Sequence, residues 1–381
     1  AHKDITPRLE LQQKSPKLMT LEEAIRHSGL KDGMTISFHH HFRGGDKVVN
    51  MVVAKLAEMG FKGLHLAASS LQDVHEPLIE HIRNGVITEI STSGLRGELA
   101  KEISHGLMEK PVVFRSHGGR GEAIASGELH IDVAFLGASS SDPLGNACGY
   151  SRSENAKSIC GSLGYALPDA HYADKVVILT DDLVPYPNTP NSISEHDVDY
   201  VVEVESVGDS SKIASGAIRD TKNPRDILLA QQAAKVIVNS GYFKNGFSIQ
   251  TGSGGASLAA VKYIRQSMID QGIKASFALG GITAHMVKMH EEGLIERLID
   301  VQSFDKVAAE SLKNDPKHKE VSACEYASMH EQGAATHYLD IVILSALEVD
   351  VNFNVNVLVG SDGIIRGAIG GHPDTAEDSA L

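Results

Sequence analysis

Two stretches of sequence that begin 213 residues apart decide the fold: DGMTISFHHHFRGGDKVVNMVVAKLAEMG, residues 32–60, and NGFSIQTGSGGASLAAVKYIRQSMIDQG, residues 245–272. Each opens with an Asx-Gly pair, passes through a short apolar strand to a glycine pair, and continues with the apolar spacing of a helix that ends at glycine. The chain is therefore predicted to contain an internal repeat of a strand–loop–helix unit.

Two later pairs of residues extend the repeat in the same order. Gly85 in HIRNGVITEI corresponds to Gly293 in MHEEGLIERL, and Asp132 corresponds to Asp340, both at an offset of 208 residues. Segments such as DVAFL and KVVILT are short and apolar throughout, which is typical of parallel strands covered on both faces. We therefore predict an α/β fold of two homologous domains, each a largely parallel sheet flanked by helices.

The repeat also predicts the division of the chain. We expect an N-terminal arm at residues 1–18, a first domain at 19–222 and a second domain at 223–381. The first half continues beyond its repeated part through two further apolar strands at 169–204, for which the second half shows no counterpart before the sequence ends. We therefore expect the second domain to be truncated at its C-terminus.

Composition and charge exclude several classes of partner. Asp and Glu number 49 against 35 Lys and Arg, which gives a net charge of −14, so the chain has no overall positive field for nucleic acid. No stretch of about 20 apolar residues predicts a membrane span, and the polar start does not resemble a signal peptide. The three cysteines form no CxxC pattern. We expect a soluble, cytoplasmic protein with no membrane partner.

A local cationic segment, FHHHFRGGDK, lies where a strand is predicted to end and a helix to begin. Strand alternation would place His39 and His41 on one face. Arg43 offers a planar fork suited to a carboxylate, while Gly44 and Gly45 allow a ligand to approach the backbone, near the free N–H groups of a helix start. The segment predicts an anion-binding site, although buried structural histidines are the alternative. No metal site is expected, because neither cysteines nor a carboxylate cluster accompany it.

An uncharged loop, IQTGSGGAS, occupies the same place in the second half. Its backbone N–H groups and small hydroxyls, from Gly252 and Ser253 to Gly254 and Gly255, suit an oxyanion or a pantetheine arm. The alternative is a tight turn packed under the sheet.

Two further segments of the second half carry candidate residues. FALGGITAHMV predicts a strand, a turn at Gly280 and Gly281, and a helix. In SALEVDVNFNV, Glu348 lies near a strand end, where it is a candidate base, nucleophile or positioning group; a hydrogen bond to a turn is the structural alternative.

The chain from Leu21 onward resembles the α subunits of bacterial citrate lyases, in the coenzyme A transferase superfamily. The matching segments include LEEAIRHSGLKDGMTISFHHHFRGGD, TSGLRGELAKEIS, ICGSLGYA and LSALEVDVNFNVNVLVGSDG. The resemblance implies two coenzyme A transferase-like domains. It also implies a transferase that exchanges an acetyl thioester for a citryl thioester.

The resemblance further implies the ligands and partners. No cofactor is expected in this subunit, which would act on a thioester of coenzyme A or of the coenzyme A-derived group on an acyl carrier. The expected partners are citrate, an acetyl thioester, the β (lyase) and γ (acyl carrier) subunits, and further copies of the chain in a homo-oligomer.

The resemblance also bears on mechanism. Many superfamily members use a Glu in an S-E-N-G turn as nucleophile, and Leu279 stands at that place here. This implies transfer through a mixed anhydride without a covalent enzyme thioester. We hypothesise that His39, His41 and Arg43 hold citrate carboxylates and that the amides of Gly254 and Gly255 face the thioester. Gly252, Ser253, Gly280 and Gly281 are the candidate residues for binding the acyl carrier or coenzyme A. The alternatives are an acetate or succinate coenzyme A-transferase with a glutamyl intermediate, and a non-catalytic, coenzyme A-binding regulatory subunit.

Overall fold

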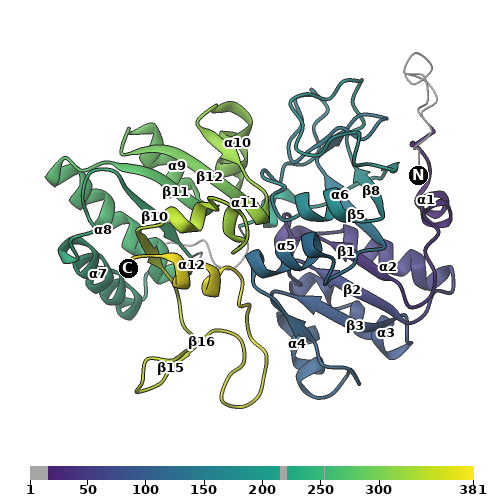
Figure 1. The fold of residues 1–381 in the computed structure, drawn as a ribbon, viewed down its shortest axis with the longest axis horizontal. Coiled ribbons are helices and arrows are strands. Elements are labelled where there is room, and N and C mark those ends of the chain that lie inside the picture. Colours follow the sequence, from purple (N-terminus) through teal and green to yellow (C-terminus); the bar gives the residue numbers. More distant parts are fainter. Residues whose placement is uncertain (1–15, 215–220, 253) are drawn as a thin grey trace.

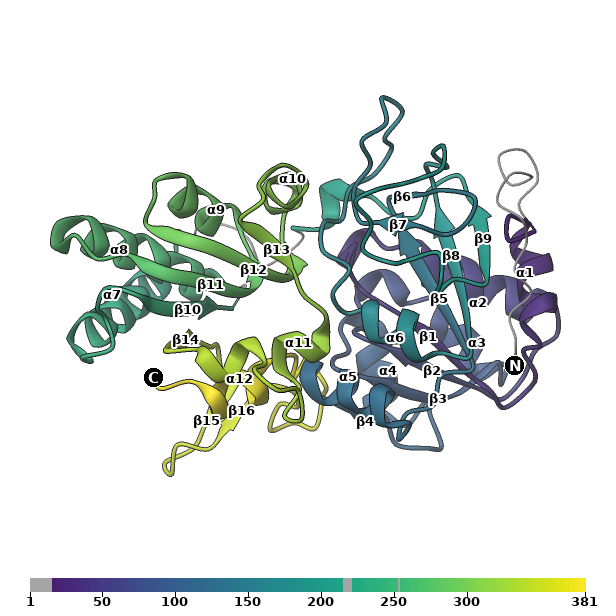
Figure 2. The same cartoon turned by 45° about the horizontal axis from the view of Figure 1, so that its top comes forward.

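The protein folds into two lobes, seen side by side in Figure 1 and, turned by 45°, in Figure 2. The computed structural model describes residues 16–214, 221–252 and 254–381. Most of the predicted arm at 1–18 and Ser253 therefore lie outside the described residues. The first lobe runs from purple to teal, and the second from green to yellow.

Each lobe is built on one parallel sheet. Among the described residues, the first sheet has the strand order β4-β3-β2-β1-β5-β8-β9 and the second has β13-β12-β11-β10-β14, and all neighbours are parallel. The strands of the first sheet are β1 (Thr35–Phe38), β2 (Leu64–Ala68), β3 (Ile87–Thr92), β4 (Val113–Phe114), β5 (Val133–Ala138), β8 (Lys175–Thr180) and β9 (Tyr200–Glu203). Those of the second are β10 (Phe247–Thr251), β11 (Ala275–Ile282), β12 (Ile295–Ser303), β13 (His318–Glu320) and β14 (Ile341–Ile343).

The two orders are the same when β10 to β14 are laid on β1 to β5, which confirms the predicted fold class. Strands β8 and β9 have no counterpart among the described strands of the second sheet. Leu381 nevertheless takes the place that Lys175 holds at the start of β8. The Lys175 N–H donates to the Asp132 carbonyl, and the Leu381 N–H donates to the Asp340 carbonyl.

Two short antiparallel hairpins repeat in the same way. They are β6–β7 (Ser140–Ser141 and Ala147–Cys148) and β15–β16 (Glu348–Val349 and Val355–Asn356). The first is buried under the segment that follows β8, whereas the second projects from the lobe with its tip exposed, as Figure 2 shows.

Helices cover both faces of each sheet. The first lobe has α1 (Leu21–Ser28), α2 (Val48–Glu58), α3 (Leu78–Arg83), α4 (Gly97–Ser104), α5 (His117–Ser126) and α6 (Leu167–Tyr172). The second has α7 (Pro224–Asn239), α8 (Gly255–Gln271), α9 (Ala284–Glu291), α10 (Lys306–Asn314), α11 (Ala323–Ala327) and α12 (His372–Asp378). The predicted domain boundary at 222 falls just before α7. One apolar cluster joins α7 to α10 to one face of the second sheet, and a separate cluster joins α11 to the other.

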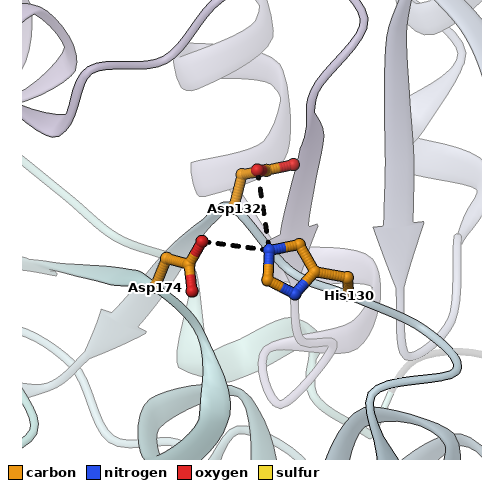
Figure 3. Close-up of side chains that lie close together, drawn as sticks. All are labelled: His130, Asp132 and Asp174. Atoms are coloured by element: carbon orange, nitrogen blue, oxygen red, sulfur yellow. Dashed lines mark hydrogen bonds and ion pairs between the residues drawn. The ribbon is translucent and has the colours of Figure 1, made fainter.

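Equivalent aspartates hold the amino end of the central strand in each sheet. Asp132 Oδ2 accepts the Thr35 N–H at 2.7 Å, and Asp340 Oδ2 accepts the Ser248 N–H at 2.9 Å. Figure 3 shows Asp132 at this edge of the first sheet, with Asp174 and the ring of His130 beside it. The repeat therefore extends to single hydrogen bonds.

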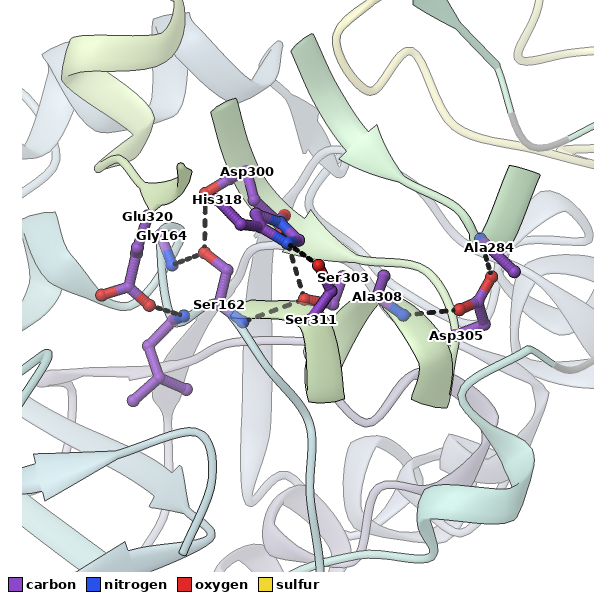
Figure 4. A network of polar contacts seen from close by, with 11 residues as sticks. Ser162, Gly164, Ala284, Asp300, Ser303, Asp305, Ala308, Ser311, His318 and Glu320 are labelled. Atoms are coloured by element: carbon purple, nitrogen blue, oxygen red, sulfur yellow. Dashed lines mark hydrogen bonds and ion pairs between the residues drawn. The ribbon is translucent and has the colours of Figure 1, made fainter. Parts of the chain in front are cut away.

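An interdomain strap, residues 159–166, joins the two lobes (Figure 4). The Ser162 hydroxyl donates to the Asp300 carbonyl in β12 at 2.9 Å, and the Leu163 N–H donates to the Glu320 carboxylate in β13 at 2.6 Å. The strap belongs to the first half but is hydrogen-bonded to the second sheet.

Glycines let the strap approach that sheet closely. A Cβ on Gly164 would lie 2.3 Å from the Val321 carbonyl oxygen, and one on Gly161, whose φ is +78°, would lie 2.1 Å from Ser303 Oγ. Any side chain at these two positions would push the lobes apart.

The strap rests on a buried polar network. Asp300 Oδ2 accepts from His318 Nε2 at 3.0 Å and from the Ser303 hydroxyl at 2.6 Å, and His318 Nδ1 lies 2.9 Å from Ser311 Oγ. Asp300 and His318 are both buried, so the network fixes the end of β12 against β13.

Asp132→Ala and Asp340→Ala should each lower the free energy of unfolding, measured by urea denaturation, by about 1–3 kcal/mol, because each leaves a strand N–H without its acceptor. Glu58→Ala removes an exposed carboxylate and is the control, with an expected loss below about 1 kcal/mol. Losses no larger than that of the control would contradict a role of these aspartates in holding the strands.

Candidate functional site

A cavity of about 140 Å³ lies between the lobes, where the carboxyl ends of the two sheets face each other. Parallel α/β sheets bind ligands at this edge, because the loops that follow the strands meet there. Residues of the first half that line it are His40, Arg43, Ser70, Gln72, Ser93, Arg96, His117 and Tyr165. Those of the second half are Gln250, Thr251, Gly252, Gly281, Gln302, Phe304, Tyr326, Leu344, Ala368, Gly370, Gly371 and His372.

Two arginines give this cavity its charge. Arg43 has a left-handed φ of +49°, uncommon for a residue with a side chain, and its guanidinium lies 4.8 Å from the ring centre of Phe304. Its buried Nη1 has no partner among the described residues. Burial, together with the charge of Arg96, lowers the pKa of Arg43 to about 10, so it remains a cation at neutral pH. The site thus holds positive charge without a neutralising carboxylate.

Three rings form one wall of the cavity. The Tyr165 ring stacks on His40, with centroids 5.1 Å apart and planes 13° apart, and lies 4.2 Å from the ring of His117. Burial lowers the pKa of His117 to about 3 and that of His40 well below its usual range. Both imidazoles are therefore neutral at pH 7 and offer hydrogen bonds rather than charge.

The lobes hold this wall together. The side-chain amide of Gln302 on β12 donates to the His40 carbonyl at 3.0 Å, and the backbone N–H of His117 donates to the Gly370 carbonyl. Asp374 accepts from the Ser116 hydroxyl at 2.5 Å, which ties the C-terminal segment to the start of α5. Residues from both halves are needed to close the cavity.

No Asp or Glu is among the described residues that line the cavity. Leu279, which the resemblance placed at the position of a nucleophilic Glu, is fully buried in β11 and packs in the apolar cluster of α11. The described lining of the inner cavity therefore offers no carboxylate to attack a thioester.

A second, outer cavity of about 590 Å³ adjoins the first and shares Arg43, Gln72, Arg96, Gly252, Ala368 and His372 with it. The residues that line only the outer one include one carboxylate, Asp73; the others are Gly44, Gly254, Ser345, Ala346, Leu347, Val357, Arg366 and Gly367. The predicted cationic and neutral loops thus meet here, from opposite lobes. A small inner cavity behind a larger opening suits a small ligand that reacts with the end of a long one.

The rings of His39 and His41 lie together, with centroids 4.5 Å apart, as strand alternation predicts, although β1 ends at Phe38. His39 is buried and its Nε2 contacts the Gly137 carbonyl at 2.9 Å; burial lowers its pKa to about 4. His41 is also fully buried, and neither lines either cavity. The residue that reaches the cavity is His40.

The sequence suggested that the start of α2 is open to an anion, but a side chain of the protein already occupies it. Asp46 Oδ2 accepts the Val49 N–H at 3.1 Å and also lies 3.1 Å from His75 Nε2. Gly45 contacts no cavity: a Cβ there would lie 2.2 Å from the Asp209 carbonyl oxygen. Its small size serves close packing, while Gly44 faces the outer cavity.

The glycines of the second half serve different purposes. Gly252 lines both cavities, but its N–H already donates to the Ile343 carbonyl at 2.9 Å. Gly254 lines the outer cavity just before α8, whose first residue is Gly255. Ser253 lies outside the described residues. Among the described glycines of this loop, Gly254 therefore lines the outer cavity without the hydrogen bond that occupies the Gly252 N–H.

Gly280 and Gly281 form no turn, because β11 runs through them to Ile282 with a shift of register between the two. A Cβ on Gly280 would meet the Gln250 amide at 2.6 Å, and one on Gly281 would meet the Phe304 ring at 2.0 Å. These glycines make room for two side chains of the cavity, and only Gly281 lines it.

Glu348 is not brought together with the other candidates. It lies on the β15–β16 hairpin and lines neither cavity. Its carboxylate accepts the Ser361 N–H at 2.9 Å and the Asn356 amide at 3.0 Å, and these bonds hold its pKa below the usual range. The geometry matches the structural alternative, a carboxylate bonded to a turn.

One group of side chains has the spacing of metal ligands: His130, Asp132 and Asp174, seen in Figure 3. It lies at the amino edge of the first sheet, away from the cavity.

Separately, no helix among the described residues is both long and apolar enough to span a membrane.

Several residues of the cavity were missed by the sequence reasoning. Arg96 and Tyr165 lie in segments that match the family, TSGLRGELAKEIS and ICGSLGYA, but nothing in the sequence connects them with each other or with His372. His117 and Gln302 carried no local signal. Only the fold brings these residues to one place.

Comparison with known proteins agrees with the resemblance. Residues 15–381 match the family model described as "Citrate lyase, alpha subunit (CitF)". The chain is 62% identical over 369 residues to the citrate lyase alpha chain of Haemophilus influenzae, which covers 97% of this chain and 73% of that one. The chain belongs to the citrate lyase α-subunit family. This confirms the resemblance and the prediction of an enzyme component of citrate lyase.

Solved structures agree with this assignment. The crystal structure of the putative alpha subunit of citrate lyase in complex with citrate from Streptococcus mutans matches with a TM-score of 0.93 and 57% identity, covering all of this chain and 73% of that one. A malonate decarboxylase alpha subunit from Acinetobacter baumannii matches at 17% identity with a TM-score of 0.70, covering 97% of this chain and 66% of that one. The second likeness shows a shared fold.

Glu320, under the strap, should make stability depend on pH. Burial raises its pKa from 4.5 to about 7. A raised carboxyl pKa means that the folded state binds the proton more tightly, so this contribution to stability is present below pH 4.5 and is lost as pH rises to about 7. Glu320→Gln keeps an acceptor for the Leu163 N–H without the charge. The melting temperature of Glu320→Gln minus that of wild type should therefore be larger at pH 8 than at pH 5.

Other carboxyls titrate in the same range, so the difference between the two proteins is the measured quantity. Glu296→Gln, at an exposed position, is the control and should show no such change. An equal difference between Glu320→Gln and wild type at both pH values would contradict the raised pKa.

Proposed function

We propose that the chain is the acyl-transfer component of a citrate lyase, exchanging an acetyl thioester for a citryl thioester in the cavity between its lobes. The observation that carries this is a small cavity with two guanidiniums, Arg43 and Arg96, and no carboxylate among its described lining residues. A ligand with several carboxylates would supply the missing negative charge. The citrate complex of the Streptococcus mutans relative supports this choice of ligand.

Citrate would lie in the inner cavity, with carboxylates on Arg43 and Arg96. The neutral rings of His40 and His117 would add hydrogen bonds without adding charge. His39 and His41 lie behind this wall, where they support it rather than touch the ligand. The thioester would enter through the outer cavity, past Gly252 and Gly254.

The proposed reaction has two steps. A citrate carboxylate oxygen attacks the acetyl carbonyl, the C–S bond breaks, and the thiolate leaves, which yields a mixed anhydride. The thiolate then attacks the citryl carbonyl, the anhydride C–O bond breaks, and acetate leaves. Both steps develop an oxyanion, for which amides at the start of α8 are the proposed donors. Leu279 supports transfer without a covalent enzyme thioester.

The partners follow from this reaction. We propose that the chain acts with a γ subunit that carries the thioester, on a coenzyme A-derived group, and with a β subunit that cleaves the citryl thioester. It would hold no cofactor of its own and act in the cytoplasm within a homo-oligomeric assembly. The outer cavity, at about 590 Å³, is large enough for the end of a pantetheine arm.

A transfer assay tests this function. The purified chain is mixed with citrate and acetyl-coenzyme A or an acetylated carrier, and thioesters and intact protein are followed by mass spectrometry. Citryl thioester and acetate should appear together, and the protein mass should not change. A hydroxylamine-sensitive adduct on a Glu would favour the glutamyl mechanism. Reaction with citramalate or succinate alone would change the substrate, and no reaction with any acid would favour the regulatory alternative.

Arg43→Ala should raise the KM for citrate about 10- to 100-fold, because a hydrogen bond to a charged group contributes about 1.5–3 kcal/mol. The KM for the acyl donor should change far less. Arg83→Ala, which removes an exposed cation paired with Glu102, is the control and should change neither. Equal effects on both KM values would remove Arg43 from the citrate site.

A further inference from the structure

Gln250 places an unused hydrogen-bond acceptor at the cavity. It lies on β10, is 8% exposed and lines the inner cavity. Its Nε2 donates to the Tyr326 hydroxyl at 2.8 Å, whereas its buried Oε1 has no partner among the described residues. An unsatisfied buried acceptor lowers stability, so a ligand that donates to it is bound more tightly.

The position of the amide is restricted by its neighbours. The carbon, nitrogen and oxygen of the amide lie 2.6–2.8 Å from where a Cβ on Gly280 would be, and the φ of Gly280 is +93°. Only glycine leaves this space and adopts this φ without strain. Tyr326 is itself buried on α11. The glycine below and the tyrosine hydroxyl beside it restrict the amide to one place.

The rest of the cavity is rich in donors. Arg43 and Arg96 supply N–H groups, and Thr251 and Tyr165 supply hydroxyls. These match the oxygens of carboxylates, which only accept hydrogen bonds when ionised. Carboxylates leave an acceptor such as Gln250 Oε1 unsatisfied. A ligand that satisfies it must carry a donor of its own, and in a hydroxy acid that donor is the hydroxyl.

We propose that Gln250 determines specificity by accepting a hydrogen bond from the tertiary hydroxyl of the substrate, so that the site selects a hydroxy polycarboxylate over the same acid without the hydroxyl. This rests on the proposed function, because citrate carries such a hydroxyl. It assigns to Gln250 a role apart from charge recognition, and to Gly280 and Tyr326 the role of positioning residues for its amide.

Isothermal titration with three ligands tests this proposal. The ligands are citrate, tricarballylate (which is citrate without the hydroxyl) and citramalate (which keeps the hydroxyl but lacks one carboxylate). Wild type should bind citrate about tenfold or more tightly than tricarballylate. In Gln250→Met, citrate and citramalate should each weaken about tenfold while tricarballylate stays within about twofold, so the preference for the hydroxyl disappears. Tyr326→Phe, which releases the amide, should lower the same preference by less.

Gln302→Met is the matched control, since Gln302 lines the same cavity but its amide donates to the His40 carbonyl. It should weaken citrate and tricarballylate by the same factor. If Gln250→Met also weakens both equally, the amide serves a carboxylate or the fold, and the proposal fails while citrate binding stands. If wild type binds none of the three ligands, the proposed function itself fails. Melting temperatures of the variants show whether each is folded.

Discussion

The hydrogen bonds that carry the interdomain strap into the second sheet are the interaction on which the candidate site depends. Each half, taken alone, has a parallel sheet whose loops open at its carboxyl end. Ser162 and Leu163, in the strap of the first half, are hydrogen-bonded to β12 and β13 of the second half. Tyr165, two residues further along the strap, forms part of the cavity wall. The two repeated halves form one site because the carboxyl ends of their sheets face each other.

Burial then decides the chemistry of that site. The chain carries a net charge of −14, yet the guanidiniums of Arg43 and Arg96 line its cavity. Burial lowers the pKa values of His40 and His117, so these two rings are neutral at neutral pH. Such neutral groups set the directions of hydrogen bonds. The proposed role of Gln250 is one consequence of this division.

The repeat made most of the fold predictable from the sequence. Asx-Gly pairs, apolar strands and equivalent aspartates such as Asp132 and Asp340 are local features, and they sufficed to predict two homologous, largely parallel sheets. The site was less predictable. Arg43 and the glycine loop were found because they follow repeated strands, but strand alternation does not say which face meets the ligand, and His40 lines the cavity rather than the pair His39 and His41. Arg96 and His117 follow other strands of the first lobe than Arg43 does, and only the order of the strands in that sheet brings them to one cavity.

A crystal structure of the protein soaked with citrate tests the central claim most directly. The account predicts one citrate molecule in the inner cavity, with carboxylates against the guanidiniums of Arg43 and Arg96 and its hydroxyl toward Gln250. Citrate bound elsewhere, with the inner cavity unchanged, would contradict the assignment of this cavity as the substrate site.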